Sequence, residues 1–564
     1  MKLLNVLFLC GSFLLCGELR TINFSEWSNS AGDLHNKGLS KQNLAHRSFT
    51  PVADAIEDIL GVSLKEKIFA YARKENAIIQ DNPFKDKKAN VRIGKELAEQ
   101  EKAFLKVRAI KTKRALEKFL GKSLEDCYIP RIAFCASGGG YRALIATVGS
   151  LMGAQIIGLL DTATYMAALS GSAWTLAAWT AIGSNIAEFK EYMIPRLSFG
   201  LTNIRSASEA QGIASLFIAK YFYNQPLGCV DPYGALIANA LLSHFGQMRQ
   251  RVYLSDQCTR VEKGDWLFPI YTAASVDENR PTEWYEFTPY EVGGTWLGAG
   301  GAFVPSWAYG RKFYAGVCVN NAPPQSLGYM MGMFGSAFAA TFSQIYESIN
   351  QNIENVLVRQ AIGRLIESIG KKRLACAQDF NFTAGLSSSP VSHLPTLKLA
   401  DAGVDFNLPL PPLLRAERAV DVIIMLDASE DIKGGSQLPD AFDYARRKGI
   451  NMPQFDYSDI EQRACTIFKN EQDPRVPVII YLPRIKDHGL WHRFKGQPDF
   501  KQYVQYLQRF DPEKCVESSY ADTMNFSYKE WQVRQLSALT EFNIRASKEL
   551  IVDALNWVIE KRSK

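Results

Sequence analysis

Several signatures of well-known sites are missing from this chain of 564 residues. Its six histidines form no H-E-x-x-H pair and its ten cysteines include no C-x-x-C, so the usual spacings of zinc ligands and redox thiols are absent. The dinucleotide loop G-x-G-x-x-G and the phosphate loop G-x-x-x-x-G-K-S/T are absent as well. We therefore expect no metal site and no cofactor.

A strong excess of one charge sign is also lacking. The chain has 64 Lys and Arg residues against 58 Asp and Glu residues, a net charge of +6. So small an excess does not indicate a nucleic-acid partner, although it permits weak attraction to an anionic membrane surface. Hydrophobic residues make up 47% and aromatic residues 12%, which excludes a mostly disordered chain and favours a large core or an apolar pocket.

Long uninterrupted apolar runs are missing too. Residues 143–183 are strongly apolar, but glycines, serines and Asp161 interrupt them, so we expect a buried helix–strand–helix unit there. Residues 1–17 place one lysine before an apolar run, the pattern of a short signal peptide. We therefore expect an exported or secreted protein that is peripheral to membranes. The alternative is a buried N-terminal helix in a cytoplasmic protein.

Apolar strands alternate with helical patterns along the rest of the chain. The segments VDVIIML (420–426) and VPVIIYL (476–482) are continuously apolar, as strands buried on both faces are. The sequence thus predicts an α/β fold with an open, mostly parallel sheet covered by helices on both faces. Strands are expected at 130–136, 163–169, 266–275, 396–400, 420–427 and 477–483. Helices are expected at 52–72, 95–120, 140–158, 172–183, 231–249, 329–348, 352–369, 438–448 and 531–561.

Three glycines follow the first of these strands. Gly138, Gly139 and Gly140 precede Tyr141 and Arg142 and open an apolar helix. Glycines at a strand-to-helix turn leave backbone N–H groups uncovered, with the helix dipole behind them, and so form an anion site. An oxyanion hole requires the same arrangement. A simple turn without a ligand is the alternative.

A serine lies at the next strand-to-helix turn. In YMAALSGS (165–172), Ser170 is flanked two residues away on either side by the small residues Ala168 and Ser172. This pattern is a variant of the G-x-S-x-G nucleophile elbow, in which small residues let the strand and the helix approach closely. Together with the glycine loop upstream, it predicts a nucleophilic serine.

A nucleophilic serine needs a base, and two candidates are open. Asp401 follows the strand expected at 396–400 and precedes small residues, which suits the edge of an open α/β site. His488 follows the strand expected at 477–483 and would complete a Ser–Asp–His order. Spacing alone does not decide between them.

The chain resembles the catalytic domain of the group IV (cytosolic) phospholipase A2 and fungal phospholipase B family, from about residue 95 to 490. The resemblance rests on separated motifs in the same order: SGGGYRA (137–143), ATYMAALSGSAW (163–174), EFTPYEVG (286–293), GRKFYAG (310–316), MGMFGSAF (331–338) and ADAGVDFNLPLPPLLRAERAVDVII (400–424). It implies a patatin-like fold with a Ser–Asp dyad and no catalytic histidine.

The same resemblance implies a role for each candidate residue. Ser170 is the nucleophile, and Asp401 is the base. Gly139 and Gly140 supply the oxyanion N–H groups. The substrate phosphate-binding residues are Arg142 and Arg418.

The resemblance also implies a function and a domain order. We expect a phospholipase A2 or lysophospholipase acting on phospholipid at a membrane or micelle surface through peripheral contact, without nucleic acid. A broader acyl hydrolase or transacylase, or a non-catalytic lipid-binding protein, is the alternative. After residues 1–17 we expect a helical extension over 18–94 and a single catalytic domain over 95–564, with a short cap around 339–395.

Overall fold

The structure is a computed structural model that describes residues 82–563, apart from 338–375, 511–519 and shorter gaps within 202–229, at 278, within 431–436 and within 455–459. The expected signal peptide (1–17), the helix at 52–72, most of the extension over 18–94 and most of the cap lie outside the described residues. In the described part, no helix has the length and hydropathy needed to cross a membrane.

Residue contacts divide the chain into two units. One comprises 1–82, 204–226 and 341–373, and few of its residues are described. The other comprises 83–203, 227–340 and 374–564 and contains the sheet. The sheet extends beyond the expected start of the catalytic domain at residue 95 and into the expected cap at 339–395. β1 (Arg92–Ile93) joins it before residue 95, and β10 (Ala377–Phe380) joins it within the expected cap.

A 12-stranded sheet organises this second unit. Its main path runs β1-β7-β6-β5-β4-β3-β2-β12-β14-β13, and β11 pairs with both β10 and β4 beside that path. The strands on this path after β1 are β7 (Ala302–Pro305), β6 (Glu291–Gly294), β5 (Trp284–Phe287), β4 (Phe268–Ser275), β3 (Ala163–Ala168), β2 (Ile132–Ala136), β12 (Val422–Asp427), β14 (Val478–Pro483) and β13 (Thr466–Phe468), with β11 at Thr396–Asp401.

The centre of the sheet is parallel, as the apolar strand patterns predict. The pairs β4·β3, β3·β2, β2·β12 and β12·β14 are all parallel, and every residue of β2, β3, β12 and β14 is buried. The outer strands add antiparallel pairs on both sides. The expected open α/β sheet is therefore confirmed, although the antiparallel meander over β5–β7 is absent from the sequence-based prediction. Its strands of four residues are too short to give a clear pattern.

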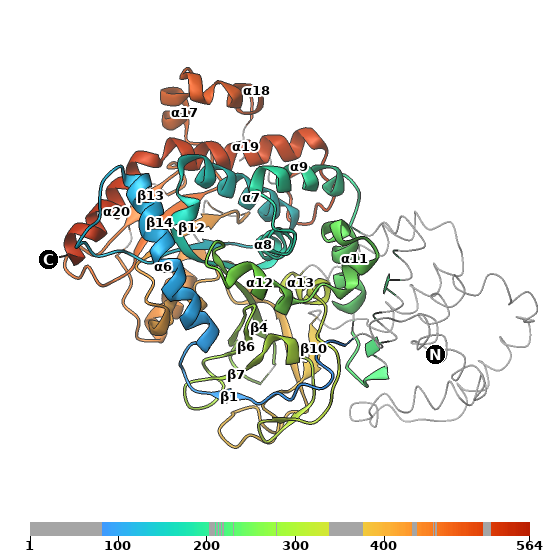
Figure 1. Cartoon of the computed structure of the whole chain (residues 1–564). Helices are drawn as coiled ribbons and strands as arrows, with labels where there is room; N and C mark the ends of the chain where they lie inside the picture. Colours follow the sequence, from blue (N-terminus) through green and yellow to red (C-terminus); the bar gives the residue numbers. More distant parts are fainter. Residues whose placement is uncertain are drawn as a thin grey trace, which may run out of the picture. The chain divides into compact units, whose positions relative to one another are not determined.

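Helices cover both faces of this parallel centre (Figure 1). On one face, α6 (Glu99–Leu120) and α16 (Gln437–Arg447) pack on alternate residues of the strands, including Tyr165, Ile423 and Met425. On the other face lie α7 (Gly140–Ile157) and α8 (Ser170–Ile182), and α19 (Glu530–Ala546) packs along α7. Gly149 allows this helix pair to approach closely, because an added Cβ there would lie 2.1 Å from Ser537 O on α19.

Two expected helices are interrupted in the structure. The helix at 231–249 is α11 (Val230–Leu241) followed by 3₁₀ turns, in which Gly246 has a φ of 55°. The helix at 531–561 is two helices, α19 and α20 (Lys548–Arg562), which meet at Ser547.

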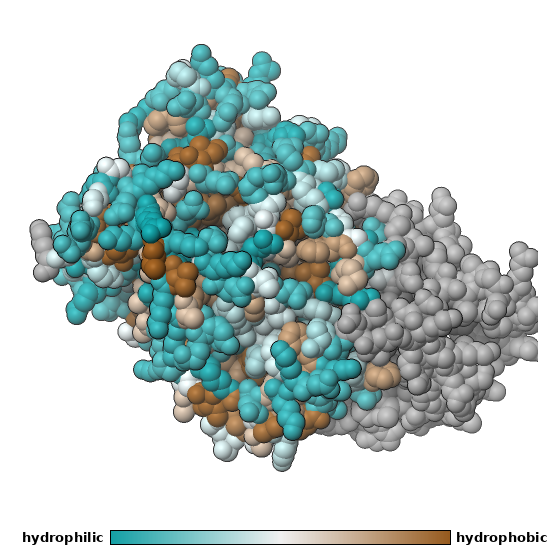
Figure 2. Space-filling model, in the orientation of Figure 1, coloured by the Kyte–Doolittle hydropathy of each residue, from teal (hydrophilic) through white to brown (hydrophobic). Residues whose placement is uncertain are grey.

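Most of the visible surface of the described residues is hydrophilic, and apolar residues gather in small groups (Figure 2).

Candidate active site

Ser170 occupies the sharp turn between β3 and α8. β3 ends at Ala168, and α8 begins at Ser170, as the elbow pattern predicts. The φ of Ser170 is 51°, in the left-handed region that non-glycine residues rarely adopt. Such backbone strain is concentrated at functional sites, where the surroundings impose it. The serine is buried, and its Oγ makes no aligned hydrogen bond with the described residues.

The elbow packs directly on the glycine loop that follows β2. A Cβ added to Gly171 would lie 1.9 Å from the carbonyl oxygen of Gly140, so only glycine fits there. Ser172, one of the small residues of the elbow, donates a hydrogen bond to Ser137 O at 2.5 Å. The two strand-to-helix turns are therefore held together through backbone contact and one short hydrogen bond.

The glycine loop presents free N–H groups beside Ser170. Gly139 has a φ of 134° and Gly140 a φ of 56°. Their N–H groups have no acceptor among the described residues and lie at the N-terminus of α7. The neighbouring Gly138 N–H donates to Asn407 Oδ1 at 3.0 Å, and a Cβ on Gly138 would lie 2.8 Å from Ser170 Cβ. Two uncovered backbone N–H groups at a helix N-terminus are the donors that an oxyanion hole requires.

Asp401 lies at the same edge of the sheet as Ser170, at the end of a strand that runs antiparallel to β4. β11, which ends at Asp401, runs antiparallel to β4. Ala168 at the end of β3 pairs with Tyr271 of β4, and Asp401 pairs with Ala273, two residues further along β4. Because Ser170 also lies two residues beyond Ala168, the register places the carboxyl beside the serine.

The surroundings of Asp401 shift the pKa of its carboxyl toward neutral pH. Burial raises its pKa from 3.8 to about 7, while hydrogen bonds from the Gly403 N–H and the Ser170 hydroxyl and the nearby backbone of Ala337 lower it. The Gly403 bond measures 2.9 Å. The Ser170 hydroxyl is thus close enough to stabilise the carboxylate without reaching good hydrogen-bond geometry. A carboxyl with a pKa near the working pH is suited to general-base chemistry.

His488 is not brought to the serine. It begins α17 (His488–Phe494) and is exposed. β14, which precedes it, is separated from β3 by β12 and β2, and three strand spacings correspond to about 14 Å. The described geometry therefore offers Asp401, and not His488, as the group beside Ser170.

Arg142 lies buried next to the glycine loop. Its Nε donates to Ala428 O at 2.8 Å, and its Nη1 donates to Ala521 O at 3.0 Å and to Thr523 Oγ1 at 2.5 Å. Its Nη2 donates no hydrogen bond among the described residues, and a Cβ on Gly139 would lie 2.5 Å from it. One guanidinium nitrogen thus remains open on the side of the expected oxyanion hole.

Arg418 has a different setting from the one expected. It precedes β12, at the edge of the sheet opposite to Ser170, and its side chain is fully buried. Its Nε donates to Glu101 Oε1 at 2.9 Å, and its Nη1 donates to Glu286 Oε2 at 2.7 Å. The expectation that Arg418 binds the substrate phosphate is therefore corrected, because these two carboxylates occupy its donors.

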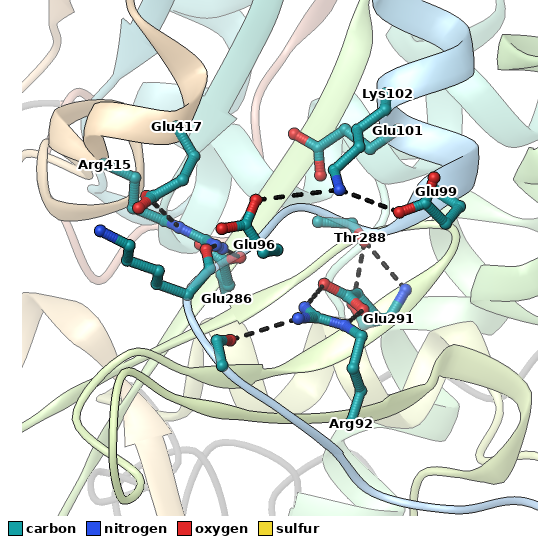
Figure 3. Close-up of polar contacts among 12 residues, drawn as sticks. Arg92, Glu96, Glu99, Glu101, Lys102, Glu286, Thr288, Glu291, Arg415 and Glu417 are labelled. Atoms are coloured by element: carbon teal, nitrogen blue, oxygen red, sulfur yellow. Dashed lines mark hydrogen bonds and ion pairs between the residues drawn. The ribbon is translucent and has the colours of Figure 1, made fainter.

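The ion pairs of Arg418 belong to a larger buried cluster. Arg415 also pairs with Glu286 (Figure 3), and the Tyr165 hydroxyl donates to Glu101 at 2.9 Å. Nearby, Arg92 pairs with Glu291 (Figure 3). The cluster ties α6, β5 and the segment before β12 together, which is a structural function.

Two residues that support the site escaped the sequence analysis. The Asn407 side chain accepts from Gly138 N–H and donates to Gly138 O at 3.1 Å, which fixes the glycine loop. The Ser336 hydroxyl accepts from Asp401 N–H at 3.0 Å. Asn407 lies inside the motif 400–424, and Ser336 lies inside the motif 331–338. Their place in these motifs is the one sequence signal that points to them.

Comparison with known proteins identifies a family. A family model described as the lysophospholipase catalytic domain matches residues 132–462, more than half of the chain. Cytosolic phospholipase A2 zeta from Mus musculus is 27% identical over 555 residues, covering 84% of this chain and 63% of the relative. Cytosolic phospholipase A2 epsilon from Homo sapiens is 25% identical, covering 84% of this chain and 61% of that relative. The chain thus spans less than two thirds of the length of these relatives.

Solved structures show the same fold. The human GIVD cytosolic phospholipase A2 superposes with a TM-score of 0.71 at 24% identity, covering 83% of this chain and 68% of that one. The same human protein in complex with methyl gamma-linolenyl fluorophosphonate superposes with a TM-score of 0.65 at 25% identity, covering 84% and 66%.

The raised pKa of Asp401 predicts a pH-dependent effect on stability. A carboxyl with a higher pKa in the folded state binds protons more tightly there, so the free energy of unfolding falls as the pH rises from 3.8 to about 7. Asp401→Asn removes that loss. We expect the free energy of unfolding of the variant to exceed that of the wild type by on the order of 1–4 kcal/mol at pH 8, and by less at pH 5.

Urea unfolding of both proteins at pH 5 and pH 8 measures this difference. Asp499→Asn serves as the matched control, since Asp499 is exposed. The same stability change for Asp401→Asn at both pH values would contradict the assignment.

Proposed function

The chain belongs to the lysophospholipase catalytic domain family, and we propose that it hydrolyses fatty acyl esters of glycerophospholipids or lysophospholipids through a Ser170–Asp401 dyad. The observation that carries this proposal is the strained, buried Ser170 between two free N–H groups and a carboxyl with a pKa of about 7. The names of the relatives support phospholipid as the substrate class.

Acylation follows from the positions of these groups. Asp401 takes the proton of Ser170 Oγ as the oxygen attacks the carbonyl carbon of the ester. The negative charge moves to the carbonyl oxygen, which receives hydrogen bonds from the Gly139 and Gly140 N–H groups. The C–O bond to glycerol then breaks, and Asp401 returns its proton to the leaving alkoxide, which leaves an acyl-serine.

Deacylation repeats these steps with water as the nucleophile. Asp401 takes a proton from the water, whose oxygen attacks the acyl-serine carbonyl. The same two N–H groups stabilise the second oxyanion, and the proton on Asp401 passes to Ser170 Oγ as the fatty acid leaves. A carboxyl with a pKa of about 7 serves both directions of this proton transfer near neutral pH.

Arg142 is proposed to hold the substrate phosphate. Its open Nη2 lies beside Gly139, so a phosphate a few bonds from the reacting ester is within reach of it. A charge-assisted hydrogen bond of this kind contributes on the order of 1.5–3 kcal/mol. Arg418 has no part in this step.

The site favours an enzyme over the non-catalytic alternative. A lipid-binding protein has no need for a serine at positive φ or for an unpaired buried carboxyl beside it. The relatives are named as cytosolic proteins, which supports the cytoplasmic alternative over export. We infer peripheral contact with the membrane or micelle that contains the substrate.

Removing the nucleophile tests the proposed reaction. Purified wild type is expected to release fatty acid from phosphatidylcholine or lysophosphatidylcholine, and Ser170→Ala is expected to lose at least ~10³-fold in kcat, because the covalent route is removed. Ser537→Ala is the control, since Ser537 is equally buried but lies on α19. Activity that survives in Ser170→Ala contradicts the proposal.

Arg142 variants test the phosphate contact. Arg142→Ala is expected to lose roughly 10- to 200-fold in kcat/KM on phospholipid and much less on a p-nitrophenyl acyl ester, which has no phosphate. Arg142→Lys restores the charge but not the planar fork, so it rescues only part of the loss. Equal losses on both substrates would assign Arg142 a purely structural function and favour a broad acyl hydrolase.

A further inference from the structure

The hairpin of β8 (Phe313–Tyr314) and β9 (Val317–Cys318) has an apolar and basic outer face. Tyr314 pairs with Val317, and Val319 N–H donates to Lys312 O at 2.9 Å. Cross-strand partners and residues two apart along a strand point to the same face, so these four side chains share one face. All four are exposed, with Tyr314 at 68% and Val319 at 60%, whereas Phe313 on the opposite face is buried.

Three further exposed lysines lie beside this face: Lys85, Lys87 and Lys88. Their turn continues to Asn90, which forms a bridge with Val317 of the hairpin. Among the described residues, neither these lysines nor Lys312 has an ion-pair partner, and Asp86 is the one acid within the turn. We call these four lysines with Tyr314, Val317 and Val319 the hairpin surface.

The tip of the hairpin lies on the side of the sheet that carries Ser170. Ala315 N–H donates to Ala384 O at 2.9 Å, in the loop that joins β10 to β11. Because β11 is antiparallel to β4, its residues before Leu399 extend beyond Ser275, the last residue of β4. β4 is parallel to β3, so this extension continues past the carboxyl edge where Ser170 lies.

A second exposed surface of similar composition lies on α6, and it serves as a comparison. It contains Lys106, Val107, Ile110, Arg114 and Lys118. Arg108 of the same helix donates to Ala163 O, at the start of β3, and to Gly264 O, which precedes β4. α6 therefore lies toward the amino edge of the parallel strands, opposite to Ser170, and a membrane bound there would face away from the site.

We propose that the hairpin surface docks the protein on an anionic lipid membrane. The lysines are attracted to the anionic headgroups, while Tyr314 and the two valines enter the boundary between headgroups and acyl chains, where tyrosine is favoured. The inference rests on the proposed function in one respect, because an enzyme of phospholipids meets its substrate in aggregates. The tip of the docked hairpin lies on the same side of the sheet as Ser170.

Vesicle sedimentation with the full chain tests the proposal. Wild type is expected to bind vesicles of phosphatidylcholine and phosphatidylserine more tightly than vesicles of phosphatidylcholine alone, and high salt is expected to weaken that binding. Neutralising the turn with Lys85→Gln, Lys87→Gln and Lys88→Gln is expected to lower the affinity for the mixed vesicles by roughly 100-fold. A separate variant, Val317→Ser with Val319→Ser, is expected to weaken binding at both low and high salt.

The matched control places the same charge change on α6, as Lys106→Gln, Arg114→Gln and Lys118→Gln, and is expected to retain wild-type affinity. Hydrolysis of a soluble p-nitrophenyl ester is expected to stay unchanged in every variant. The proposed docking surface is overturned if wild type does not bind the mixed vesicles, or if the control loses as much vesicle affinity as the variant of the lysine turn. If wild type binds vesicles but hydrolyses no ester, the proposed function fails while the binding comparison still decides the surface.

Discussion

Close backbone contact between two strand-to-helix turns is the constraint on which this site depends. A side chain at Gly171 would lie 1.9 Å from Gly140 O, so the turns after β2 and β3 meet without a side chain between them. This contact holds Ser170 at a φ of 51° and places the Gly139 and Gly140 N–H groups beside it. A non-glycine residue in that region costs about 1–3 kcal/mol, which the surrounding core must offset.

Buried acids have two different functions in this fold. Glu286 accepts from both Arg415 and Arg418, and although burial alone raises its pKa, these two arginines lower it below the ordinary value. Among the described residues, Asp401 has no cation beside it, and burial therefore raises its pKa to about 7. The paired acid ties strands and helices together, whereas the unpaired one can exchange a proton. This contrast separates the structural cluster from the candidate site.

The sequence predicts the parts of the site whose signals are local. Ser170 and the glycine loop lie at strand-to-helix turns that alternating apolar and small residues predict. Asp401 was expected at the end of a strand, but spacing could not show that β11 runs antiparallel to β4, from which it is more than a hundred residues distant. The setting of Arg418 depends on Glu101, 317 residues away, and on Glu286, 132 residues away. Such contacts arise from tertiary packing and leave no trace in local patterns.

The pH dependence of labelling at Ser170 tests the account most directly. A fluorophosphonate reacts with the serine without a leaving lipid, so its second-order rate constant reports how well the base activates Ser170. The account predicts labelling at Ser170 alone, with a rate that rises with pH and has a midpoint near the Asp401 pKa of about 7. It also predicts that Asp401→Asn abolishes this rise and that His488→Ala leaves it in place. A midpoint that persists in Asp401→Asn, or disappears in His488→Ala, would contradict the dyad.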